Sequence, residues 1–127
     1  MSALVLDAGA LIAVDRDDRA MIARLRVAEQ HGIGLVTHAL VVAQVWRDGR
    51  GRQARLGRFL DAVDVRALDQ AIGREAGVLL GKCKLEDPID AAVVLVSRPG
   101  DRILTSDTDD LGRLARAAKR GVLVLGC

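Results

Sequence analysis

Short apolar segments alternate with longer segments of helical periodicity along the whole chain. The apolar segments have the length and composition of buried strands. They cover residues 3–6, 33–37, 64–68, 102–105 and 122–125. Strands that alternate with helices predict a mostly parallel sheet covered by helices on both faces. We therefore expect an α/β fold, a three-layer α/β/α sandwich around a sheet of four or five strands.

The expected helices are bounded by capping residues. Asp17 or Asp18 can cap a helix that stops at His31-Gly32, and Asp69 can cap a helix over 70–82. Pro88 suits the first turn of a helix that runs to Ser97. The remaining expected helices cover 10–14, 39–47, 53–63 and 107–120. The 127 residues contain no repeat, linker or low-complexity segment, which predicts one domain over 1–127.

Composition narrows the class of protein. The only aromatic residues are Trp46 and Phe59, so aliphatic side chains must build the core, and base stacking on aromatic platforms is disfavoured. Cys83 and Cys127 form no metal-spaced cluster, which favours a reduced, cytoplasmic setting. No apolar run approaches the roughly 20 residues of a membrane span, so we expect no membrane partner.

The net charge of +2 indicates no partner, but one segment is locally basic. Between residues 47 and 58 there are five arginines and one aspartate. Two interpretations remain open: a solvated helix face, or a rim that faces phosphate groups. On the second, Arg47, Arg50 and Arg52 are candidate substrate-binding residues.

Three aspartates stand where a parallel α/β sheet places functional residues. Asp7 ends the first strand, and Asp107 follows the fourth. Ligands bind outside the carboxyl ends of parallel strands, so these two residues can share one edge. Asp90 lies in the first turn of the helix that leads back to the fourth strand, which would start at the same edge.

Further acidic residues accompany this set. Asp87 lies three residues before Asp90, and Asp110 three residues after Asp107, so each pair can share one helix face. Two like charges about 4 Å apart repel by about 4 kcal/mol near a protein surface. A cluster of carboxylates therefore favours a bound cation, and oxygen ligands suit Mg²⁺ or Mn²⁺. Phosphodiester hydrolysis is the natural chemistry of such a site.

A purely structural interpretation stays open for part of the set. Asp87 before Pro88 is a good N-cap, and Asp107 or Ser106 could cap the last helix, with Asp110 favourable to its dipole. Asp7 has no obvious helix to cap. His31 is interpreted as a helix-end residue, and Trp46 as a core or dimer contact. His38 follows a strand and could line the site.

Three segments resemble the motifs of the PIN-domain family, in particular its VapC-type ribonuclease toxins. The first is Leu4-Val5-Leu6-Asp7-Ala8-Gly9-Ala10, similar to the opening strand and acidic motif. The second is Pro88-Ile89-Asp90-Ala91-Ala92, similar to the central Asp-Ala helix motif. The third is Leu104-Thr105-Ser106-Asp107-Thr108-Asp109-Asp110-Leu111, similar to the C-terminal motif. The three occur in the family's order and span essentially the whole chain.

The resemblance implies a Mg²⁺- or Mn²⁺-dependent endoribonuclease that acts as the toxin of a toxin–antitoxin pair. It further implies an RNA substrate, a small antitoxin partner protein and a homodimer. Carried over by motif, Asp7, Asp90 and Asp107 would be catalytic and metal-binding. Asp110 and Asp87 would support them as further metal ligands.

Two departures from the family pattern affect the expected activity. Gln44 stands where the family carries a glutamate, so this catalytic position can hydrogen-bond or coordinate but brings no charge. Gly9 stands near where many relatives have a hydroxyl. The alternative is therefore a weakened PIN-fold module that binds RNA or a protein without efficient turnover. A phosphoacceptor role for Asp7 is disfavoured, because haloacid-type phosphatases need an aspartate at the position of Gly9.

Overall fold

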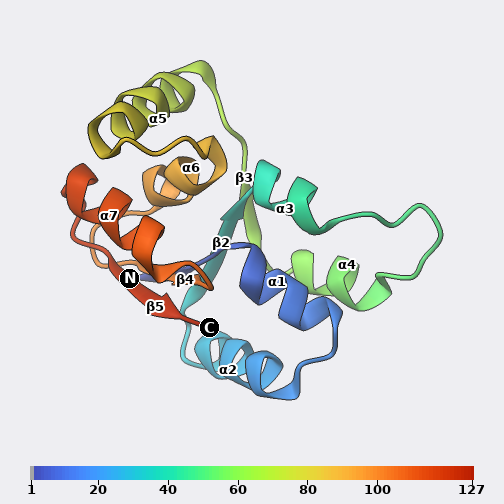
Figure 1. Cartoon of the computed structure of the whole chain (residues 1–127). Helices are drawn as coiled ribbons and strands as arrows, with labels where there is room; N and C mark the ends of the chain where they lie inside the picture. Colours follow the sequence, from blue (N-terminus) through green and yellow to red (C-terminus); the bar gives the residue numbers. More distant parts are fainter. Residues whose placement is uncertain (1) are drawn as a thin grey trace.

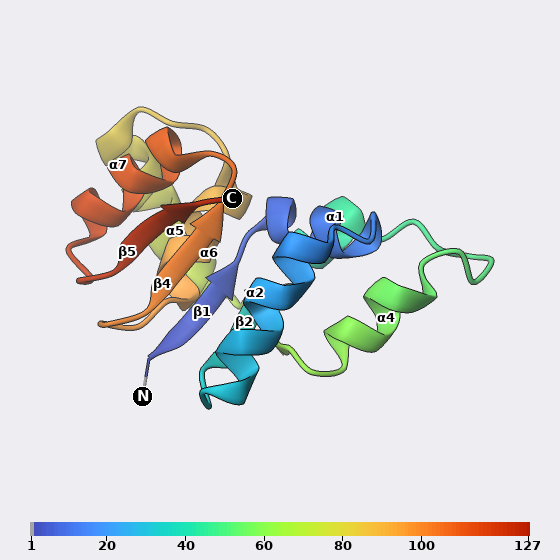
Figure 2. The same ribbon diagram turned by 90° about the horizontal axis from the view of Figure 1, so that it is seen from below.

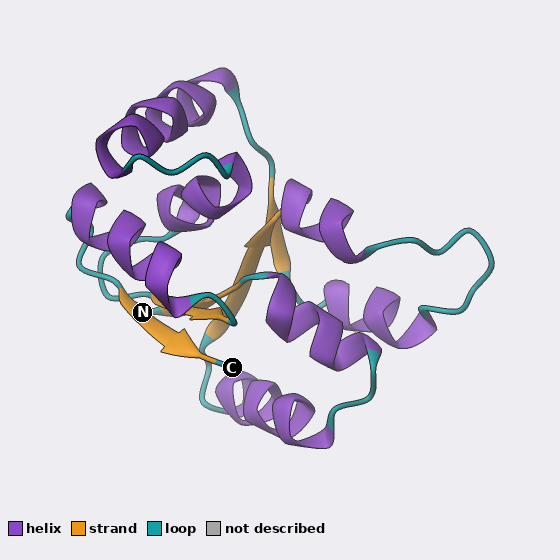
Figure 3. Ribbon diagram, viewed as in Figure 1, coloured by secondary structure: helices purple, strands orange, loops and turns teal. Residues whose placement is uncertain are grey.

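A five-stranded, all-parallel sheet forms the centre of the molecule (Figure 3). The computed structural model describes residues 2–127. Each neighbouring pair of strands is parallel, and the order is β3-β2-β1-β4-β5. The strands are β1 (Ala3–Leu6), β2 (Gly34–His38), β3 (Asp64–Arg66), β4 (Arg102–Thr105) and β5 (Leu123–Gly126). The predicted fold class is confirmed.

Helices cover the two faces of the sheet in two groups (Figures 1 and 2). The first group is α1 (Ala8–Asp15), α2 (Arg19–Gln30), α3 (Ala39–Val45) and α4 (Ala54–Leu60). The second is α5 (Gln70–Cys83), α6 (Pro88–Val96) and α7 (Thr108–Ala118). The chain moves one way across the sheet from β1 to β3 and the other way from β3 to β5. Because parallel crossovers are right-handed, this reversal puts the two groups of helices on opposite faces.

The core is aliphatic, as the composition requires. Val5 and Leu6 of β1 and Ile103 and Leu104 of β4 are fully buried at the middle of the sheet. They pack with leucines, valines and alanines from the helices, including α6, on which Ala91, Val93 and Val94 are fully buried. Among the described residues, no helix combines the length and apolar character needed to cross a bilayer.

Several expected boundaries are wrong by one to three residues, and one has a clear cause. The helix expected over 39–47 ends at Val45. The Gln53 amide donates to the Val45 carbonyl at 2.9 Å and accepts from the Arg47 N–H at 2.7 Å. A side chain from the next segment therefore takes over the hydrogen bonds of the helix end. The expected helix over 53–63 is also shorter, and Asp107 caps α7 rather than belonging to it.

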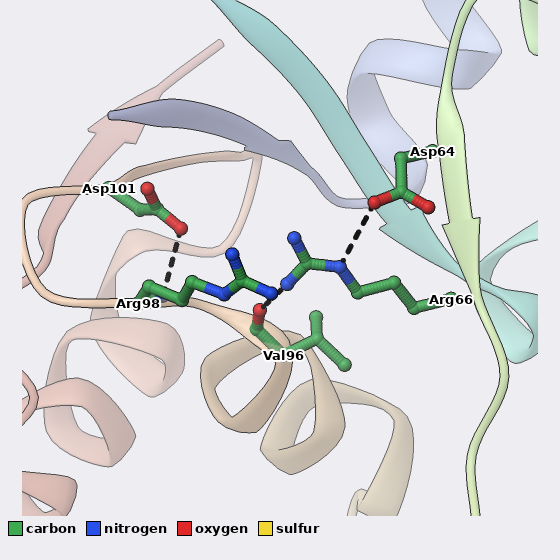
Figure 4. Close-up of polar contacts among 5 residues, drawn as sticks. All are labelled: Asp64, Arg66, Val96, Arg98 and Asp101. Carbon is green, nitrogen blue, oxygen red and sulfur yellow. Dashed lines mark hydrogen bonds and ion pairs between the residues drawn. The ribbon is translucent and has the colours of Figure 1, made fainter. Parts of the chain in front are cut away.

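Asp101, at the amino edge of the sheet, is a fully hydrogen-bonded carboxylate. It is 3% exposed and precedes β4. Its two oxygens accept from the Ala3 N–H and the Arg98 N–H, both at 2.8 Å. Nearby, Arg66 donates to the Val96 carbonyl at the end of α6 and to Asp64 (Figure 4). These contacts join the start of β1, the loop before β4 and the end of α6.

Candidate metal centre

The strand order reverses between β1 and β4, which makes their carboxyl ends the switch point of the sheet. β1 continues toward β2 and β3, whereas β4 leads to β5 on the other side. Crossovers leave this point in opposite directions, and ligands of parallel α/β sheets commonly bind outside the carboxyl ends of the strands at such a point. Asp7 directly follows β1, and Thr105 is the last residue of β4.

Three predicted acidic residues come together at this edge. One carboxylate oxygen each from Asp90, Asp107 and Asp110 lies within 4.8 Å of the other two. Asp90 comes from the first turn of α6, while Asp107 and Asp110 come from the start of α7. Both helices run antiparallel to the strands that follow or precede them, so their N-termini meet at the carboxyl edge.

Asp7 lies beside this group rather than inside it. It occupies the N-cap position of α1 but makes no side-chain capping bond. Its Oδ2 instead accepts a 2.7 Å hydrogen bond from the Thr105 hydroxyl, whose oxygen accepts from the Asp107 N–H at 3.0 Å. Asp7 is 7% exposed. The expectation that Asp7 caps no helix is confirmed, and Thr105 links Asp7 to the loop that carries Asp107.

The pKa of Asp90 reflects the number of acidic side chains around it. Partial burial, and after it the negative charges of Asp87, Asp7, Asp107 and Asp110, together raise the pKa of Asp90 to about 7. Within residues 2–127, no arginine or lysine forms an ion pair with any of these acids. The site thus concentrates negative charge that the described side chains do not neutralise.

The residues present fit a hard divalent cation. Carboxylate oxygens at this spacing are the donors that Mg²⁺ and Mn²⁺ prefer, and their number leaves coordination positions for water and a phosphate oxygen. A bound cation would also offset the repulsion by neighbouring acids, which adds to burial in raising the pKa of Asp90.

Asp87 has a clear structural role. Its Oδ1 accepts from the Ile89 N–H at 2.8 Å and the Asp90 N–H at 3.4 Å, which caps α6. It stands outside the group of three converging carboxylates. Asp107 is both a helix cap and a candidate metal ligand. Its Oδ1 accepts from the Asp110 N–H at 3.2 Å, which caps α7, and its carboxylate also belongs to the group of three.

Comparison with known proteins identifies the architecture. No protein-family model and no curated protein matches the sequence. The structure is similar to a chain in the crystal structure of VapBC2 from Rickettsia felis bound to a DNA fragment from its promoter. The TM-score is 0.73, the sequence identity is 11%, and the match covers 98% of each chain. The chain has a PIN-like fold.

Within this PIN-like fold, Gln44 is exposed on α3, whose N-terminus lies at the carboxyl edge of β2. No hydrogen bond of the described residues ties the Gln44 side chain to the acidic group. The structure therefore brings together Asp90, Asp107 and Asp110, places Asp7 beside them, and shows no hydrogen bond from the Gln44 side chain to them among the described residues.

The predicted substrate-binding arginines lie on the loop between α3 and α4, which extends away from the sheet (Figure 1). Asp48 orders this loop by accepting from the backbone N–H groups of Arg50, Arg52 and Gln53 at 2.7–3.0 Å. Arg47 turns back to the carbonyls of Ala43 and Trp46. Arg50 and Arg52 are exposed and make no side-chain hydrogen bond that the structure describes.

Gly9 has a steric explanation in this fold. A Cβ atom at position 9 would lie 3.1 Å from the Ser106 hydroxyl and 3.3 Å from the Cys127 sulfur. Ser106 therefore occupies the space next to Gly9, between Thr105 and Asp107. Asp7 does have a hydroxyl partner, but it is that of Thr105 at the end of β4 and not a residue of α1.

Proposed function

We propose that this chain is a Mg²⁺- or Mn²⁺-dependent endoribonuclease. The observation that carries the proposal is the convergence of Asp90, Asp107 and Asp110 at the switch point, with Asp7 beside them. A metal bound there would activate water and neutralise charge on the scissile phosphate. The likeness to a chain of a VapBC2 complex supports the same direction.

In this proposal, each residue around the acidic group has a separate role. Asp90, Asp107 and Asp110 supply three carboxylate oxygens, and Asp7, at the end of β1, supplies a further ligand through its other oxygen, Oδ1. Thr105 keeps one Asp7 oxygen occupied, which fixes the carboxyl orientation. Asp87 holds the first turn of α6 and adds charge from outside the group. Gln44 is the exposed catalytic candidate on α3, where its amide can hydrogen-bond to a substrate phosphate.

The loop between α3 and α4, which carries Arg47, Arg50 and Arg52 and is called the arginine loop below, is the proposed contact to the RNA backbone. Arg50 and Arg52 project from a loop whose backbone is ordered by Asp48, so their guanidinium groups remain available for phosphate. Arginine binds phosphate through paired N–H donors. Arg47, which is bound to carbonyls of α3, acts chiefly by shaping the loop.

Assignment as a toxin rests on the structural neighbour, which is part of a complex named VapBC2. We propose that this chain is inhibited by a small antitoxin protein, and that it forms a homodimer in the cytoplasm. Co-purification with the product of an adjacent gene, followed by light scattering of the complex, tests both statements. A monomer that binds no such protein would contradict them.

Cleavage of a structured RNA by the purified chain tests the nuclease. Activity should need Mn²⁺ or Mg²⁺ and disappear with a chelator. Asp90→Asn and Asp107→Asn should each lower the rate by about 100-fold or more, which corresponds to about 3 kcal/mol of transition-state stabilisation. Asp109→Asn is the matched control, because Asp109 is an exposed acid in the same turn of α7 but outside the group. Equal cleavage by all three variants would identify a contaminating nuclease.

A weakened binding module is the second candidate, favoured by the uncharged Gln44. Gln44→Glu separates the two. A gain of about tenfold or more in cleavage rate, 1.4 kcal/mol or more, would support the weakened module. An unchanged rate in an active chain would count against it.

A further inference from the structure

β2 ends in two polar residues that are more deeply buried than the acids beside them. Thr37 is 1% exposed and His38 is fully buried. A buried polar side chain is costly unless it is hydrogen-bonded, so the partners of these two residues indicate what they do. Both side chains bond to backbone carbonyls far away in the sequence.

Thr37 holds the end of β1. Its hydroxyl donates a 2.7 Å hydrogen bond to the carbonyl of Leu6, the residue directly before Asp7. A valine has nearly the same shape and an equal preference for strands, so the strand itself does not require a hydroxyl here. The hydroxyl is therefore explained by its hydrogen bond to the Leu6 carbonyl. This bond fixes the backbone at the point where the chain leaves β1 and continues into Asp7.

His38 joins two helices. Its Nδ1 accepts from the N–H groups of Leu40 and Val41 at 3.2 and 3.3 Å, which caps α3. Its Nε2 lies 3.0 Å from the carbonyl of Ile89, the residue directly before Asp90. A carbonyl only accepts, so Nε2 carries the hydrogen and the ring is the neutral tautomer.

The environment agrees with a neutral ring. Burial lowers the pKa of His38, although the Ile89 hydrogen bond and the charges of Asp7 and Asp87 act in the opposite direction. Serine, threonine or aspartate would cap α3 equally well but are too short to reach α6. The contact to Ile89 therefore explains why an imidazole stands at this position.

We propose that Thr37 and His38 are positioning residues that fix the backbone before Asp7 and Asp90 and so set the separation of these carboxylates. The inference rests on the proposed metal centre. Groups that hold ligating carboxylates in place commonly change metal affinity by about 10- to 100-fold when they are removed.

Three variants of the full chain test this. Thr37→Val and His38→Ser each remove one of the two contacts, and the serine can still cap α3. Ser97→Ala is the matched control, because the buried Ser97 hydroxyl donates to the Val93 carbonyl at 2.8 Å, at the far end of α6. All three should lower the melting temperature, since each loses a buried hydrogen bond.

Mn²⁺ affinity, measured by calorimetry, is the discriminating readout. Thr37→Val and His38→Ser should weaken binding by about 10- to 100-fold, whereas Ser97→Ala should stay within about twofold. In the metal-free protein, amide hydrogen exchange at the start of α6 should quicken in His38→Ser and not in Thr37→Val.

The outcomes separate this inference from the proposed function. Mn²⁺ binding that Thr37→Val and His38→Ser leave unchanged, or that Ser97→Ala weakens equally, overturns the inference alone. No Mn²⁺ binding by the unaltered chain overturns the proposed function and the inference with it. Thr37→Val keeps side-chain shape, so the test stands even if His38→Ser fails to fold.

Discussion

The aspartates at the two edges of the sheet have opposite hydrogen-bonding environments. At the amino edge, Asp101 accepts two backbone N–H groups and joins β1 to the loop before β4. At the carboxyl edge, Asp7 has one hydroxyl partner, and Asp90 faces four other acids. Aspartates lie beside β1 and β4 at both edges, so neither the residue type nor the strand explains the different environments of these carboxylates. The hydrogen-bond donors around each carboxylate distinguish them: Asp101 is bonded by backbone N–H groups and stabilises the fold, whereas Asp7 and Asp90 accept from no backbone N–H group of the described residues and are proposed cation ligands.

The comparison predicts that Asp101→Asn and Asp90→Asn change the free energy of unfolding in opposite directions. Asp101→Asn should lower the free energy of unfolding by about 2–3 kcal/mol, because an amide cannot accept both N–H groups without presenting its own donors to one of them. Urea unfolding at pH 8 without metal measures it. A neutral effect of Asp101→Asn would contradict the structural role.

Asp90→Asn should instead stabilise the metal-free chain at pH 8, by about 1 kcal/mol after solvent screening. The folded-state pKa of Asp90 is raised to about 7, so the folded chain holds a proton that the unfolded chain has lost. Metal-free stability should therefore fall as pH rises from about 4 through 7, and Asp90→Asn should remove this decline. Destabilisation by Asp90→Asn would show that the acid supports the fold.

Metal binding should depend on pH with the opposite sign. Mn²⁺ must displace the proton from Asp90, whose pKa is about 7. Affinity should fall about tenfold per pH unit below 7, an effect of about 1.3 kcal/mol between pH 7.5 and 6. Titrations with Mn²⁺ across this range provide the test. A flat profile would indicate that Asp90 is already ionised or does not bind the metal.

The smallest effect concerns the arginine loop. Replacing Arg50 and Arg52 with alanine should lower the salt dependence of RNA binding, because each lost phosphate contact reduces the slope of log affinity against log salt by about 0.7 on a single strand. Arg74→Ala, an exposed arginine on α5, should leave the slope unchanged. If the slope of log affinity against log salt is the same in all variants, the arginines of the loop are solvated and do not contact phosphate.

Local periodicity, together with capping residues and Pro88, was sufficient to predict each strand and helix that the structure describes, with bounds that differ by up to three residues. The motif positions of Asp90, Asp107 and Asp110 also led to the group that the structure forms. Strand order could not be read from the sequence, since it depends on where β4 inserts. The end of α3 was misplaced because Gln53, eight residues beyond Val45, supplies its final hydrogen bonds.

The structure separates residues that sequence spacing treats alike. Asp87 and Asp90 stand three apart, as do Asp107 and Asp110. Asp87 is a cap outside the group, whereas Asp107 is both cap and member. Thr37 was not singled out, because its partner carbonyl is 31 positions away. His38 was expected only as a residue that could line the site, and its bond to the Ile89 carbonyl, 51 positions away, could not be predicted. A polar pair at the end of an otherwise apolar strand was the available signal.

Diffraction from crystals soaked in Mn²⁺ tests the central claim most directly, because anomalous scattering locates the metal without assumptions about activity. A peak should lie among Asp90, Asp107 and Asp110, at about 2.2 Å from their oxygens. Crystals that show no such peak at saturating Mn²⁺, with Asp87 and Asp107 engaged only at their helix ends, would contradict the assignment of this edge as a metal centre.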